Sequence, residues 1–153
     1  SECIKETQEL KVWVTAPEIN GLSILGSGTI VTENTLTTQN DDLDMRIEGS
    51  GKMDLDLNVT GFDMDMNGSG TLQVHGKAEQ YSNVSVEGSG SYEGFDLESQ
   101  SSRIVIQGSG KAEVGSTEEL NVEIAGSGEV YYTGSPQITQ EVSGSGSIAP
   151  KKE

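Results

Sequence analysis

The amino-acid sequence predicts an all-β fold, a parallel β-helix (β-solenoid) of about seven coils with 18–23 residues each. The tripeptide Gly-Ser-Gly recurs at nearly constant intervals, and apolar residues alternate with polar ones on both sides of each copy. The composition agrees, because 32% apolar residues and 20 glycines in 153 residues suit a thin core along an axis better than one central core.

The repeat is the strongest signal in the chain. Gly-Ser-Gly occurs seven times, beginning at Gly26, Gly49, Gly68, Gly88, Gly108, Gly126 and Gly144. The successive intervals are 23, 19, 20, 20, 18 and 18 residues, whereas a Gly/Ser linker has no structured flanks of this kind. A fixed period near twenty residues is typical of a solenoid.

The flanks of each copy have the period of two that marks a strand with one buried face. The residues two positions before the first glycine are all apolar: Ile24, Ile47, Met66, Val86, Ile106, Ile124 and Val142. Those two positions after the second glycine are Ile30, Met53, Leu72, Tyr92, Ala112, Val130 and Ile148. Each repeat is therefore strand, corner, strand and a variable stretch.

The corner and the variable stretch complete the coil. Two strands that turn without a loop need backbone angles, or a close approach between coils, that only glycine allows. We expect third strands in the variable stretches, namely Leu36–Leu43, Val59–Phe62, His75–Tyr81, Phe95–Leu97 and Gly115–Leu120. A propeller blade needs about 40 residues, and a meander favours Asn-Gly or Asp-Gly turns, so both alternatives fit less well.

Charge and cysteine content limit the partners. The net charge of −16 disfavours nucleic acid and anionic lipid. Cys3 is the only cysteine, so it forms no internal disulfide, and Glu2 stands where a lipoprotein cleavage site has a small residue. Residues 1–9 are polar and have no apolar stretch typical of a signal peptide, so we expect either that a signal was removed or that the sequence starts inside a longer protein. No apolar run reaches the length needed to cross a bilayer. We expect residues 1–9 to be disordered.

The chain resembles the bacterial head GIN domain, a family labelled putative auto-transporter adhesin. The resemblance rests on the runs Val130–Pro136, Val142–Ile148 and Lys11–Pro17 together with the serial corners, and it covers Leu10–Pro150. It implies a single-stranded, right-handed β-helix on an exported protein, often a lipoprotein, of a Gram-negative bacterium. Two departures are that Asp does not follow the corners and that the stretch before Trp13 is shorter than in most members.

Candidate catalytic groups are sparse. His75 is the only histidine and follows Val74, where we expect a solvated turn at a strand end. Arg46 and Arg103 are the only arginines, and they fall in different registers of different coils. A Ser-His-acid site or a polysaccharide-cleaving site would need these groups to converge with carboxylates. We therefore predict no enzyme, no catalytic residue and no cofactor.

Two surface features are the sharper candidates. Asp54 and Asp56 alternate with apolar residues, as do Asp63 and Asp65, and Asp41, Asp42 and Asp44 lie just upstream. Aligned carboxylates could bind Ca²⁺, although a solvated surface that opposes edge-to-edge aggregation is the favoured interpretation, and we assign no metal site. Trp13 alternates with Val12 and Val14, which predicts an outward indole that Val31 and Tyr131 could extend into a patch.

The sequence thus predicts a β-helix over residues 10–150, with residues 151–153 as a tail. Its expected role is a non-catalytic, exported cell-envelope module, an adhesin or binding scaffold whose partner is an unidentified protein or glycan. A carbohydrate-active β-helix enzyme acting on a polysaccharide is the alternative. The expected location is the periplasm or the outer-membrane surface, and the open ends of a β-helix leave homo-oligomerisation open.

Overall fold

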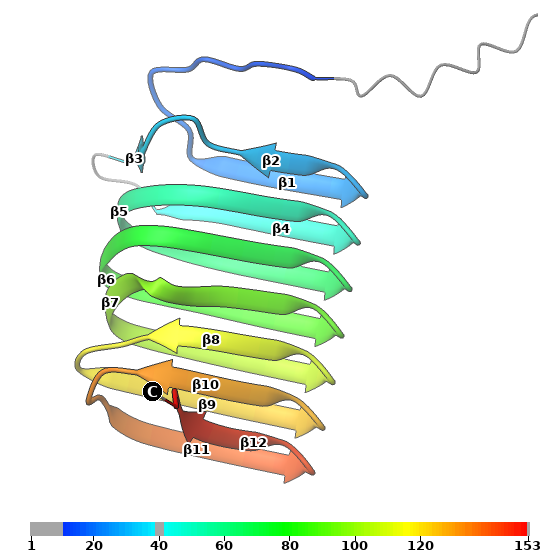
Figure 1. Cartoon of the computed structure of the whole chain (residues 1–153), viewed down its shortest axis with the longest axis vertical. Coiled ribbons are helices and arrows are strands. Elements are labelled where there is room, and N and C mark those ends of the chain that lie inside the picture. The colour runs from blue at the N-terminus through cyan, green and yellow to red at the C-terminus, as the bar shows by residue number, and fades with distance from the viewer. Residues whose placement is uncertain (1–10, 39–41, 153) are drawn as a thin grey trace, which may run out of the picture.

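A computed structural model describes residues 11–38 and 42–152, and in this part of the chain all regular structure is strand (Figure 1). The strands are β1 (Gly21–Gly26), β2 (Thr29–Val31), β3 (Leu36–Thr37), β4 (Leu43–Gly49), β5 (Lys52–Gly68), β6 (Thr71–Gly88), β7 (Ser91–Gly108), β8 (Lys111–Gly115), β9 (Glu119–Gly126), β10 (Glu129–Thr133), β11 (Gln137–Gly144) and β12 (Ser147–Pro150). The prediction for residues 1–9 and Cys3 lies outside the described residues.

The strands wind into a β-solenoid of about seven turns, which confirms the predicted fold class. Each strand pairs in parallel with its equivalent in the next coil, and the apolar positions align, as in the pairs Met45↔Met64 and Ile106↔Ile124. The Gly-Ser-Gly corners stack along one edge of the rod, on the right in Figure 1. The right-handed winding stays a prediction.

The corners are hydrogen-bonded from coil to coil. The Ser109 amide donates to the Gly88 carbonyl at 2.9 Å, and the Lys111 amide donates to the Gly90 carbonyl at 3.0 Å. Gly108 has a φ of +129°, and a Cβ there would lie 2.4 Å from the carbonyl oxygen of Gly88. A Cβ on Gly110 would lie 2.8 Å from the Val86 side chain. The first glycine is therefore required by backbone conformation and the second by the core.

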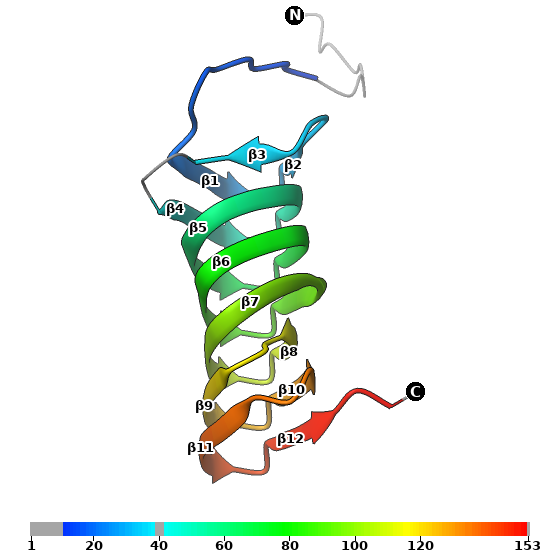
Figure 2. The same cartoon turned by 90° about the vertical axis from the view of Figure 1, so that its left-hand side faces the viewer.

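The third strands differ from the prediction. Figure 2 shows β5, β6 and β7 as unbroken ribbons around the rod, because their variable stretches stay extended and paired with neighbouring coils. The stretch Gly115–Leu120 is not a strand throughout, since β8 ends at Gly115 and β9 begins at Glu119. The stretch Leu36–Leu43 contains only the two residues of β3 and the first residue of β4 among those the structure describes.

The interior is one continuous apolar cluster that runs from Ile24 to Val130. Tyr92 is its largest fully buried side chain, and Gly94 leaves room for it, because a Cβ there would lie 2.3 Å from the Tyr92 hydroxyl. Ser82 and Ser102 are also buried, and their hydroxyls form a hydrogen bond of 2.9 Å. The interior is thus filled by side chains.

The two ends of the rod are more exposed. Leu22 is only half-buried in the first coil, whereas its equivalents Met45 and Met64 are buried, and Val142 is 40% exposed in the last coil. Residues 11–20 have no regular structure and lie beyond β1 (Figure 1). The part of the chain that the structure describes contains no helix able to span a membrane.

Candidate functional site

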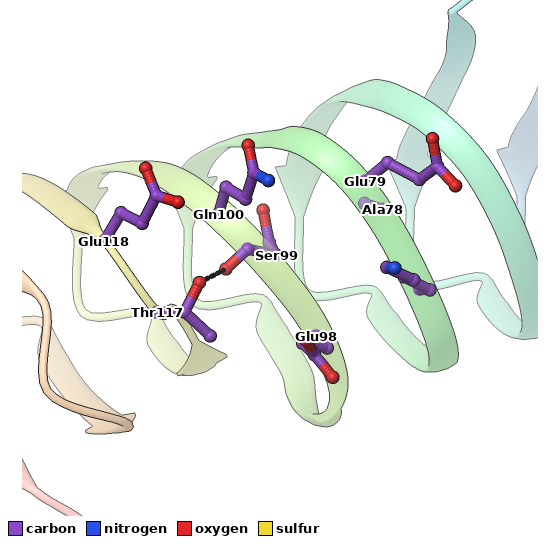
Figure 3. A pocket seen from close by; sticks show the side chains of 8 residues that line it. Ala78, Glu79, Glu98, Ser99, Gln100, Thr117 and Glu118 are labelled. Carbon is purple, nitrogen blue, oxygen red and sulfur yellow. Dashed lines mark hydrogen bonds between the residues drawn. The ribbon is translucent and has the colours of Figure 1, made fainter.

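Two adjoining hollows lie on the side of the rod opposite the corners. We call this side, which the variable stretches form, the third side. The Lys77 hollow, of about 290 Å³, is bounded by residues of three successive coils: Lys77, Ala78, Glu79, Glu98, Ser99, Gln100, Thr117 and Glu118 (Figure 3). The Thr117 hydroxyl donates to the Ser99 carbonyl at 3.3 Å and ties two of these coils together. Three carboxylates and one ammonium thus surround a polar depression.

The second hollow, the Phe95 hollow, has about 280 Å³ and shares Glu98 and Thr117 with the first. Its other lining residues are Gly76, Phe95, Asp96, Leu97, Gly115, Ser116, Thr133 and Gly134. At Gly134 the chain passes close to the preceding coil, because a Cβ there would lie 2.0 Å from the carbonyl oxygen of Ser116. The ammonium of Lys151 lies over the Phe95 ring, 4.4 Å from its centroid.

The four aspartates singled out from the sequence do not form one cluster. Asp54 and Asp56 lie in the part of β5 that leaves a corner, whereas Asp63 and Asp65 lie in the part that approaches the next one. The structure thus separates the two pairs onto different sides of the rod. Asp42 precedes β4 and Asp44 is its second residue, on the same side as Asp63, and Asp41 lies outside the described residues.

The aspartates have partners within the chain. The Asp63 carboxylate accepts hydrogen bonds from the Tyr81 hydroxyl at 3.1 Å and the Asn83 amide at 2.9 Å. Burial raises the pKa of Tyr81, and hydrogen bonds to Asp42 and Asp63 raise it further. The Asp56 carboxylate accepts a hydrogen bond from Thr35 at 3.4 Å. Within residues 11–38 and 42–152, there is no group of three or more His, Cys, Asp or Glu side chains that could hold a metal ion.

His75 is not at a strand end, which corrects the prediction. It lies within β6, because that strand continues past Gly76 on the glycine's positive φ of +102°. Its imidazole lies between two carboxylates, 3.7 Å from Asp54 and 3.6 Å from Asp96, and its side chain is 39% exposed. The histidine therefore belongs to an outer row of polar residues.

The predicted outward position of the Trp13 indole is confirmed, but the prediction of one patch that includes both Val31 and Tyr131 is wrong. Trp13 is 71% exposed, but Val12 and Val14 are each 75% exposed, so this segment does not alternate. Its indole donates a hydrogen bond to Glu33 at 3.2 Å. Val31 and Tyr131 occupy the same register in distant coils, separated by the polar row Asp54, Gln73, Glu93 and Glu113.

The basic residues pair with acids in separate places. Arg46 contacts Glu48 in β4, and Arg103 in β7 lies 3.8 Å from Glu123. The Lys111 ammonium donates to Glu113 at 2.5 Å, and this hydrogen bond raises the pKa of the lysine. The arginines thus lie in different positions of their coils and in strands that β5 and β6 separate.

Sequence reasoning did not find the hollows. Their walls come from the variable stretches, which have no common period. The one signal in the sequence is the set of additional glycines, Gly76, Gly115 and Gly134, which line the Phe95 hollow from three different coils.

A family model described as putative auto-transporter adhesin, head GIN domain, matches residues 2–136. Among solved structures, a putative adhesin from Bacteroides fragilis NCTC 9343 is 30% identical with a TM-score of 0.82, over 89% of this chain and 62% of that one. A putative lipid binding protein from Parabacteroides distasonis ATCC 8503 is 27% identical with a TM-score of 0.77, over 86% and 53%. A putative adhesin from the same strain is 25% identical with a TM-score of 0.71, over 86% and 58%.

The chain therefore spans between 53% and 62% of the length of these solved structures. No curated protein matches it.

Proposed function

Because this chain belongs to the family of putative auto-transporter adhesins with the head GIN domain, we propose that it is a non-catalytic binding module of the bacterial cell envelope. In this proposal the domain is exported, to the periplasm or the outer-membrane surface, and presents a rigid face to a protein or glycan. The solved structures named adhesins, at 25–30% identity, support the adhesive role.

The observation that carries the proposal is the contrast between the filled interior and the hollowed third side. Phe62, Tyr92 and Ile106 are each 0% exposed, so side chains occupy the axis of the rod and a partner would be held on the outside. The third side offers carboxylates, hydroxyls and an aromatic ring within two adjoining hollows. Such a mixture of polar groups and aromatic surface is typical of binding sites.

A screen of the purified chain against glycan and protein arrays tests the proposal, with and without Ca²⁺. We expect at least one ligand class to bind, and we expect Glu98→Gln to weaken that binding because Glu98 borders both hollows. Glu141→Gln is the matched control, since it removes the same charge from exposed strand β11. Arrays without any ligand, or equal losses in both variants, would contradict binding at the third side.

Export is tested separately by fractionation of cells that make the full-length precursor. The proposal requires the protein in the periplasmic or outer-membrane fraction, and recovery only with cytoplasmic proteins would reject it. Turnover of an acidic polysaccharide by the purified chain would favour the carbohydrate-active enzyme instead.

A further inference from the structure

A contact within the chain indicates which chemical group the Phe95 hollow binds. The Lys151 ammonium lies 4.4 Å from the centroid of the Phe95 ring, within the range in which a cation is attracted to an aromatic face. The carboxylates of Asp96 and Glu98 line the same hollow. The site is therefore an aromatic face beside two acidic groups, and the chain's own Lys151 lies over that face.

The ring is displayed by an irregularity in the strand. Gln73 pairs with Glu93 and His75 pairs with Asp96, so two residues of β7 lie opposite one residue of β6. An extra residue of this kind is a β-bulge, which re-aims side chains. Gly94, one of the two bulge residues, is buried next to Tyr92. Phe95, the other, is half-buried and forms part of the wall of the hollow.

The lysine that lies over the ring, Lys151, directly follows β12. The Lys151 amide donates to the Tyr132 carbonyl at 2.8 Å, which fixes the backbone from which the side chain reaches the ring. A tethered group of this kind competes at an effective concentration on the order of millimolar. Lys151 thus acts as an intramolecular competitor for any cation that approaches the hollow.

We propose that the Phe95 hollow is a recognition site for the lysine side chains of a basic polypeptide segment and that Lys151 masks its aromatic ring. The inference rests on the proposed binding function and names the partner chemistry of the third side. A lysine is preferred to an amino sugar because the group that lies over the Phe95 ring is an ammonium on a slender aliphatic stem. The net charge of −16 would draw a basic segment towards the rod.

The chain offers a direct spectroscopic test, because it has two phenylalanines, Phe95 in the hollow and Phe62 in the core at 0% exposure. Labelling with 4-fluorophenylalanine gives one ¹⁹F resonance for each. Removing the masking lysine with Lys151→Ala is expected to shift the Phe95 resonance and leave the Phe62 resonance in place. Lys152→Ala, which changes the adjacent lysine, is the matched control and is expected to shift neither.

The labelled chains are then titrated with hexalysine. We expect the Phe95 resonance to move, and we expect Lys151→Ala to bind hexalysine about 3-fold or more tightly than the unaltered chain or Lys152→Ala. In calorimetry, Phe95→Leu added to Lys151→Ala should abolish that gain, since leucine retains apolar volume but has no aromatic face. Circular dichroism verifies that every variant is folded.

Three outcomes overturn the inference: a Phe95 resonance unmoved by hexalysine, equal affinities for the two lysine variants, or a gain that survives Phe95→Leu. A response to a glucosamine hexamer without a response to hexalysine also overturns it. If the array screen yields a ligand that depends on Glu98 while these results are negative, the proposed function stands and only the lysine assignment is lost.

Discussion

Replacement of a corner glycine in the middle of the rod tests how the coils stack. Gly108 has a φ of +129°, a region that only glycine readily occupies, and a non-glycine residue there costs about 1–3 kcal/mol. The added Cβ would also lie 2.4 Å from the Gly88 carbonyl oxygen, so the coils must separate. That separation weakens the 2.9 Å hydrogen bond from Ser109 to Gly88, which contributes about 0.5–1.5 kcal/mol.

The first coil provides a matched control. Gly26 has a similar φ of +118°, but a Cβ there meets nothing within 4 Å because no described coil precedes it. Both alanine variants lose conformational freedom in the unfolded chain, which offsets about 0.4–1 kcal/mol in each. We expect Gly108→Ala to lower the free energy of unfolding by about 0.5–4 kcal/mol, and Gly26→Ala by about 0.5–1.5 kcal/mol less, because the weakened hydrogen bond between coils is the difference between them.

The assay is urea unfolding followed by circular dichroism at the strand band. Ser109→Ala is a second control in the same coil, and it should change the free energy of unfolding by less than about 0.5 kcal/mol because its side chain is exposed. Equal effects of Gly108→Ala and Gly26→Ala would refute the reasoning, since the contact between coils would then add nothing to the backbone strain.

Three further predictions concern the interior. Ile106→Ala should lower the free energy of unfolding by about 2–5 kcal/mol, whereas Val142→Ala, in the same row but 40% exposed, should lower it by less than about 1 kcal/mol; urea unfolding measures both. Ser82→Ala should cost about 1–3 kcal/mol because it leaves the buried Ser102 hydroxyl without its partner, and the double variant with Ser102→Ala should cost less than the sum of the single changes in a double-mutant cycle. Burial raises the pKa of Tyr92 above the ordinary value of about 10, so its contribution to stability is complete below pH 10 and is lost as the pH rises further. Tyr92→Phe should therefore reduce the alkaline loss of stability and remove a late-titrating signal from the absorbance at about 295 nm, and an unchanged titration curve would count against a buried phenol.

The repeated part of the structure could be predicted from the sequence because each coil imposes the same local requirement. Apolar residues beside every corner must stack on their equivalents, so the same pattern of apolar and polar residues recurs in each coil. The buried Ile47, Met66 and Val86 confirm this prediction. The family resemblance is likewise confirmed by the match over residues 2–136.

The non-repeated features could not be predicted in the same way. The bulge at Gly94 and Phe95 depends on how β6 and β7 pair, and nothing in a period of two announces one extra residue. Trp13 lies in an alternating sequence, but alternation alone does not supply a neighbouring strand with which to pair. Asp54 and Asp63 are nine positions apart on one continuous strand, and the bend of that strand around the rod separates them.

The direction of the hydrogen bonds between corners has a mechanical consequence. These bonds run along the long axis, so tension between the two ends pulls the coils apart one after another instead of shearing many bonds at once. A coil of 18 residues, such as that from Gly108 to Gly126, would lengthen to about 60 Å when fully drawn out, against a rise of about 4.8 Å when wound. Under tension the rod would therefore lengthen coil by coil, in steps of 18–23 residues. Each step would relieve the tension and delay dissociation of a bound partner.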